Sequence, residues 1–121
     1  MKLFLANAPW AKNGQHGVRA GSRWPHWLEA GSPYMPFPFY LAYSTSILEK
    51  EGHTVKLIDA IAEDMPTKEF LAQCKSFQPD IILLETSTPT IDLDIDTGKK
   101  LKAISPSHAK LILCGPHVSV I

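Results

Sequence analysis

The chain contains short apolar runs without an internal polar residue, separated by segments with helical spacing of apolar residues. These runs are centred on Leu3–Ala6, Ile81–Leu84 and Leu111–Leu113. Such a run is typical of a strand that is covered on both faces of a parallel sheet. A fourth segment, His53–Asp59, alternates apolar and polar residues, which favours a position nearer the sheet edge. We therefore predict strands at 2–8, 53–59, 80–84 and 109–114, with 80–84 central.

Helices are predicted between these strands. The first follows Pro38, runs to Glu51 and stops at Gly52, a favoured C-terminal cap. The second opens at Pro66 or Thr67 and ends before Pro79. One side of the first helix is lined by Phe39, Tyr43, Ile47 and Lys50. The second helix has apolar residues at helical spacing, namely Phe70, Leu71, Cys74 and Phe77.

A third helix is predicted from Thr90 to Ser105–Pro106. Asp92, Asp94 and Asp96 fall in its first turns, where negative charge meets the positive end of the helix dipole. Strands and helices therefore alternate, which predicts a right-handed parallel α/β sheet of Rossmann or flavodoxin type with helices on both faces. Because the chain stops directly after the fourth strand, we expect residues 1–121 to be one α/β domain, truncated there, from the N-terminal end of a longer protein.

Residues 10–37 have no helical or strand period and are rich in glycine and proline. A loop of this length is unusual inside a compact domain and is commonly functional or disordered. Its aromatic residues argue against disorder, so we predict an ordered flap. Within it, Arg19 and Arg23 flank Gly21 and could bind carboxylate or phosphate groups, although surface charges paired with local acids are the alternative.

The most informative segment for function follows the third predicted strand, where Thr86, Ser87 and Thr88 stand before Pro89. Ligands of open α/β sheets bind beyond the carboxyl ends of the strands, so these hydroxyls are candidate ligand contacts. The alternative is that Thr88 or Thr90 caps the next helix. At the end of the fourth strand, Gly115, Pro116 and His117 reach the same edge. His117 could contact a ligand there, and the alternative is that it caps a helix or packs within the fold.

Composition excludes several functions. Twelve basic and twelve acidic residues cancel, which gives no reason to expect a nucleic-acid partner or an anionic membrane. No apolar run approaches the about 18 residues of a membrane span, and no signal peptide is recognisable. Two cysteines, Cys74 and Cys114, form neither a disulfide framework nor a metal-site spacing, so a reducing cytoplasm is expected.

Several catalytic and nucleotide-binding motifs are missing. Asn7-Ala8-Pro9-Trp10 follows the first strand in place of a dinucleotide fingerprint, and there is no P-loop. Ser87 has no nucleophile-elbow sequence around it, and the five histidines are scattered without metal-ligand spacing. We predict neither catalytic residues nor protein metal ligands in this chain.

An ordered series of segments extends over essentially the whole chain: 17–25 (GVRAGSRWP), 36–43 (PFPFYLAY), 51–55 (EGHTV), 57–60 (LIDA), 85–89 (ETSTP) and 114–117 (CGPH). The series resembles the N-terminal domain of cobalamin-dependent radical S-adenosylmethionine (SAM) enzymes. The resemblance implies a cobalamin-binding domain followed by a barrel domain that binds SAM and a 4Fe-4S cluster. The C-x-x-x-C-x-x-C cluster motif and the D-x-H-x-x-G cobalamin signature are both absent here.

The resemblance also implies roles for individual residues. Thr86, Ser87 and Thr88 would bind the nucleotide tail or amide groups of cobalamin, and Gly115, Pro116 and His117 would line the opposite wall. Cys114-Gly115 replaces a glycine pair of related domains. The segment with Arg19, Gly21 and Arg23 would cover part of the corrin. Two alternatives stay open: the sugar-nucleotide half of a glycosyltransferase, and an interaction domain without a ligand.

Overall fold

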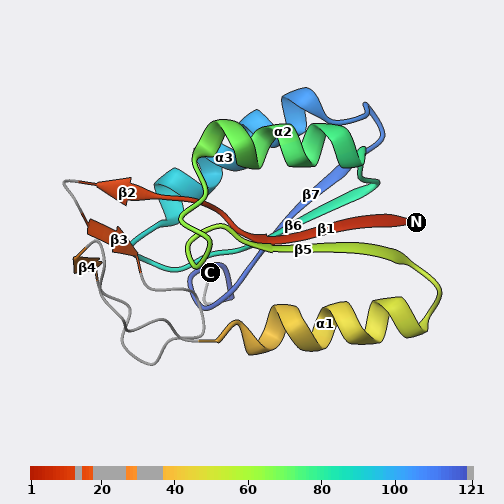
Figure 1. The fold of residues 1–121 in the computed structure, drawn as a ribbon, viewed down its shortest axis with the longest axis horizontal. Helices are drawn as coiled ribbons and strands as arrows, with labels where there is room; N and C mark the ends of the chain where they lie inside the picture. The colour runs from red at the N-terminus through yellow and green to blue at the C-terminus, as the bar shows by residue number, and fades with distance from the viewer. Residues whose placement is uncertain (13–14, 18–26, 30–36, 120–121) are drawn as a thin grey trace.

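The computed structural model describes residues 1–12, 15–17, 27–29 and 37–119. Four strands form a parallel sheet, namely β1 (Lys2–Asn7), β5 (Thr54–Asp59), β6 (Ile81–Glu85) and β7 (Lys110–Cys114), in the order β5-β1-β6-β7. The helices are α1 (Phe39–Lys50), α2 (Thr67–Phe77) and α3 (Ile91–Ile104). The chain therefore has the predicted Rossmann or flavodoxin-like α/β fold (Figure 1).

The unbroken apolar run 81–84 forms an inner strand, as predicted. β6 pairs with β1 on one side and with β7 on the other. Ile82 and Leu84 are fully buried, while Ile81 and Leu83 on the other face are half-buried. β5 lies at the sheet edge, which confirms the interpretation of its alternating sequence.

Helices cover both faces of the sheet (Figure 1). On the face of α2 and α3, Phe4 of β1 is fully buried against Phe70, with ring centroids 5.6 Å apart, and against Phe77 at 6.3 Å. On the face of α1, Leu41 packs in a cluster with Leu3 and Leu5 of β1. Ile112 of β7 remains 43% exposed, because α1 packs mainly on β5 and β1.

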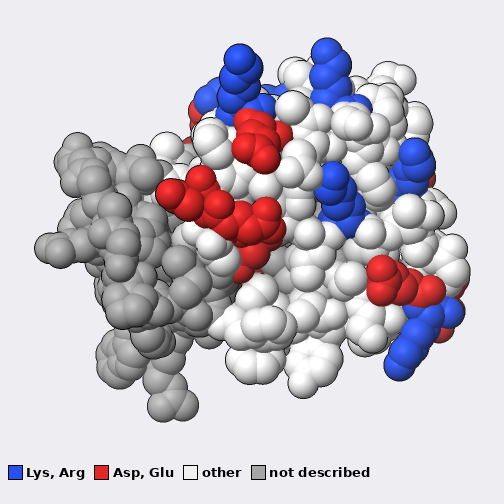
Figure 2. Space-filling model, in the orientation of Figure 1, with Lys and Arg blue, Asp and Glu red and all other residues white. Residues whose placement is uncertain are grey.

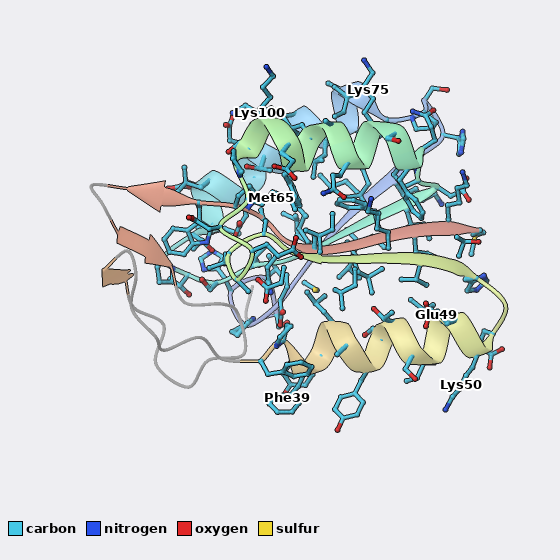
Figure 3. The ribbon with its side chains drawn as sticks, viewed as in Figure 1. Phe39, Glu49, Lys50, Met65, Lys75 and Lys100 are labelled. Carbon is cyan, nitrogen blue, oxygen red and sulfur yellow. The ribbon has the colours of Figure 1, made fainter. Side chains whose placement is uncertain are left out.

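The orientation of α1 differs from what its apolar spacing suggested. Phe39, Tyr43 and Ile47 are each about 60% exposed or more, and Phe39 points away from the sheet (Figure 3). The buried side is led by Leu41, which is 1% exposed. Apolar residues line more than one side of α1, so spacing alone could not identify the side that contacts the sheet.

Residues 10–37 were predicted to be a long ordered loop without a strand period, but the part that the structure describes contains short strands. β2 (Ala11–Lys12), β3 (Gln15–Gly17) and β4 (Trp27–Glu29) form a small antiparallel sheet, which lies beside the carboxyl end of the main sheet (Figure 1). These strands have two or three residues each, too few to establish an alternation of apolar and polar positions. Their pairing rests on backbone hydrogen bonds, which nearly every residue type other than proline can form.

None of the helices in the described part of the chain is long and apolar enough to cross a membrane.

Candidate functional site

The candidate site lies at the carboxyl edge of the parallel sheet. From β1 the chain passes through α1 to β5 on one side, and then returns through α2 on the other face to β6 on the other side of β1. The connections therefore diverge between β1 and β6. In sheets of this order, the carboxyl ends beside such a switch point are where ligands bind.

The segment after β6 begins with two hydroxyls that serve the fold itself. Thr86 is fully buried, and its hydroxyl donates a hydrogen bond of 2.8 Å to the carbonyl oxygen of Cys114. Ser87 is also buried, and its Oγ lies 3.0 Å from the hydroxyl of Thr90. Thr88, in contrast, is exposed. The Thr86 and Ser87 hydroxyls thus fix the segment in place, and Thr88 is the one of the three that faces outward.

Thr90 is the N-cap residue of α3, but its hydroxyl makes no capping bond to the helix backbone. It donates to Oδ2 of Asp94 at 2.5 Å and accepts from the backbone N–H of Ser87 at 3.2 Å. Asp94 lies in the first turn of α3, as predicted, and is 2% exposed. Burial raises the pKa of its carboxyl to about 6, against the lowering effect of the hydrogen bonds from Thr90 and Ser87.

The segment after β7 lies directly beside the segment after β6. The backbone N–H of Thr86 donates to the carbonyl of Cys114 at 2.7 Å, which extends the pairing of the strands. Gly115 has φ +115°, and a Cβ at this position would lie 2.2 Å from the Thr86 carbonyl oxygen. Nδ1 of His117 is 3.3 Å from the hydroxyl of Thr88, which joins the two segments near the surface.

The structure thus brings together the six candidate residues that follow β6 and β7: Thr86, Ser87, Thr88, Gly115, Pro116 and His117. Thr88 and Pro116 are exposed, and His117 is half-exposed. Arg19, Gly21 and Arg23 lie outside the described residues. Among the residues that the structure describes, no group of three or more His, Cys, Asp or Glu side chains could hold a metal ion.

Sequence reasoning missed three polar residues at this edge, each the last residue of its strand. Asn7 ends β1, Asp59 ends β5 and Glu85 ends β6. Asn7 pairs with Asp59 in the sheet register, and Glu85 lies one residue beyond the pair of Ala6 and Leu84. The available signal was a polar residue at the end of an apolar run. Figure 2 shows exposed Asp and Glu side chains beside this end of the molecule and a further group at the lower right of the view.

Comparison with known proteins finds a relative for part of the chain. The chain is 34% identical over 82 residues to a protein of Pyrococcus horikoshii named uncharacterized methyltransferase PH0819. The match covers 68% of this chain and 17% of that protein. This chain therefore resembles part of a methyltransferase. No protein-family profile matches the chain, and no solved structure matches it.

Replacing Asp94 with asparagine should remove a pH dependence of stability between about pH 4 and 6. Because the folded pKa of about 6 exceeds the ordinary value of 3.8, the folded chain holds this proton more tightly than the unfolded chain. The contribution of this protonated carboxyl to the free energy of unfolding is complete below about pH 4. It is lost as the pH rises through 6, and the free energy of unfolding falls by about 3 kcal/mol. Urea titrations at several pH values should show this slope in the wild type and a flatter profile in Asp94→Asn. Equal slopes would contradict the assignment.

Cys114 should react slowly with thiol reagents at neutral pH. Burial, and secondly the neighbouring Glu85 carboxylate, raise the pKa of its thiol to about 11, so little thiolate is present. Alkylation by iodoacetamide at pH 7.5 should be at least about 100-fold slower in the folded chain than in urea-unfolded chain, where thiol pKa values are near 8.5. Peptide mass spectrometry distinguishes Cys114 from the buried Cys74. Glu85→Gln should accelerate the reaction, and equal rates in folded and unfolded chain would refute the prediction.

Proposed function

We propose that this chain is the cobalamin-binding module of a radical SAM methyltransferase and performs no catalysis alone. The observation that carries the proposal is the juxtaposition of the segments after β6 and β7 at the carboxyl edge, joined through Thr88 and His117. The similarity to part of a methyltransferase supports it, because cobalamin supplies a carrier for methyl groups when bound. SAM and a 4Fe-4S cluster would be bound by a C-terminal radical SAM domain of the same protein.

The residues at the edge fit a large cofactor with many polar substituents. Thr88, Pro116 and His117 are accessible in part or fully, and would contact the cofactor directly. Thr86, Ser87 and Gly115 would act by holding the two segments together, since their polar and backbone atoms are engaged with each other and with Cys114 and Thr90. Arg19, Gly21 and Arg23 stay proposed contacts from the segment 10–37.

Titration of the purified chain with hydroxocobalamin tests the proposal. We expect a saturable change in the visible spectrum and retention of the cofactor through gel filtration. At free cobalamin 100 times Kd, linkage adds about 2.7 kcal/mol of stability, which corresponds to a Tm increase of roughly 10 °C for a domain of this size. Absence of both effects at saturating cobalamin would overturn the proposal. Stabilisation by UDP-glucose instead would favour the sugar-nucleotide alternative.

Variants of the exposed residues locate the binding surface. Thr88→Val and His117→Ala should each weaken cobalamin binding by about 5–10-fold, the effect of losing about 1 kcal/mol of hydrogen bonding or packing. Ser107→Ala is the matched control. Ser107 is exposed and precedes β7, so it lies at the amino edge of the sheet. Equal weakening in all three variants would argue against a site at the carboxyl edge.

A further inference from the structure

A row of polar side chains crosses the carboxyl edge on the face of α1. Side chains of a strand alternate between the faces, and Leu5, Leu57 and Leu83 belong to the α1 cluster. Two residues further along the same strands stand Asn7, Asp59 and Glu85, and Cys114 pairs with Glu85. In order across the sheet, the row is Asp59, Asn7, Glu85 and Cys114.

The centre of this row contains an unsatisfied hydrogen-bond donor. Asn7 is 2% exposed, and its Nδ2 has no hydrogen-bond partner among the described residues. A buried amide donor without an acceptor costs about 1–3 kcal/mol and is rare in folded proteins. The residue lies on β1, the strand that flanks the switch point of the sheet. Such a group beside a ligand edge indicates a binding partner that supplies an acceptor.

The neighbours of Asn7 define what else the partner must offer. Glu85, on β6, is 6% exposed. Asp59, on β5, lies opposite Asn7 in the strand register, on the side of β1 away from Glu85. Carboxylates accept hydrogen bonds at about four lone-pair sites, so each can accept a ligand donor in addition to its contacts within the chain. An anionic ligand would be repelled by two carboxylates, and an ammonium group would leave the Asn7 donor unpaired. A group with one acceptor and two donors satisfies all three side chains.

We propose that the row binds a primary carboxamide. Its carbonyl oxygen accepts from Nδ2 of Asn7, and its NH₂ group donates to Glu85 or Asp59, one strand spacing of about 4.8 Å away. If the Asn7 amide were turned over, a primary carboxamide would still complement it, because it presents both a donor and an acceptor. The inference rests on the proposed function, since the corrin ring of cobalamin has several primary carboxamides at its periphery.

The first test uses cobalamins in which one peripheral carboxamide is hydrolysed to a carboxylate. One derivative carries its new carboxylate at the carboxamide that contacts the row. Wild type should bind cyanocobalamin at least 10-fold tighter than that derivative. Glu85→Gln should reduce this ratio to below 3, because the repelling carboxylate is gone. Glu63→Gln is the control, as Glu63 is an exposed acid in the turn after β5 and lies outside the row. Ratios near 1 for every derivative would overturn the inference while leaving cobalamin binding in place.

A second test does not depend on cobalamin. Propionamide at millimolar concentration should shift the ¹⁵N and ¹H resonances of the Asn7 side-chain amide, and sodium propionate should not. Asn7→Leu should weaken cyanocobalamin binding 5–20-fold with a Tm no lower than that of the wild type, because it also removes the unsatisfied donor. If cobalamin fails to bind but propionamide shifts these resonances, the proposed function fails and the carboxamide site stands. If propionamide has no effect and Asn7→Leu binds normally, the carboxamide site is refuted.

Discussion

Gly115→Ala is expected to destabilise the chain by at least about 3 kcal/mol. A Cβ at this position would lie 2.2 Å from the carbonyl oxygen of Thr86, so the backbone has to move. The φ of +115° is also unfavourable for any residue with a side chain. Movement breaks the backbone and side-chain hydrogen bonds from the fully buried Thr86 to the carbonyl of the partly buried Cys114.

Gly52→Ala is the matched control for this change. Gly52 also has a positive φ, +83°, but a Cβ there would meet nothing within 4 Å. Its substitution should cost about 1–2 kcal/mol from backbone strain alone. Urea unfolding of the two variants therefore separates strain from the steric clash. Equal losses in both would show that the contact between the segments after β6 and β7 is unimportant.

Leu41→Ala should destabilise the chain by about 2–5 kcal/mol, whereas Ile47→Ala should change stability by less than about 0.5 kcal/mol. Leu41 is 1% exposed and packs against Leu3 and Leu5, so its truncation leaves a cavity between α1 and the sheet. Ile47 is 61% exposed on the same helix, and alanine has the higher helix propensity. Thermal and urea unfolding measure both.

This pair of variants also tests the orientation of α1. A packing interface on the side of Phe39, Tyr43 and Ile47 would reverse the order of the two losses. In that arrangement Phe39 and Tyr43 would be buried against the sheet. In the structure they are 58% and 67% exposed.

Much of the fold could be predicted because the necessary signals are local. An apolar run such as Ile81–Leu84 needs cover on both faces, and it forms an inner strand. Gly52 ends α1 with the positive φ that a glycine adopts without strain. The segments after β6 and β7 were expected at one edge because parallel strands end on the same side. His117 and Thr88 do meet there.

The hydrogen-bond partners and the burial of several polar side chains could not be predicted, because they depend on how the segment before α3 folds and on its contact with the segment after β7. The hydroxyls of Thr86 and Ser87 resemble ligand contacts in sequence, but the structure engages them with Cys114 and Thr90. Asp94 was expected in the first turns of the helix, but its burial and its hydrogen bond from Thr90 were not foreseen. In each case, the environment comes from a neighbour whose position the chain fixes only on folding.

The sequence by itself determined the alternation of strands and helices, the inner position of β6 and the candidate segments after β6 and β7. These follow from the hydrophobic effect acting on local patterns. Only the tertiary structure decided that α1 packs through Leu41 and that Asn7, Asp59 and Glu85 share one row. Strand order and register place these residues together, and both depend on pairing between strands that are far apart along the chain.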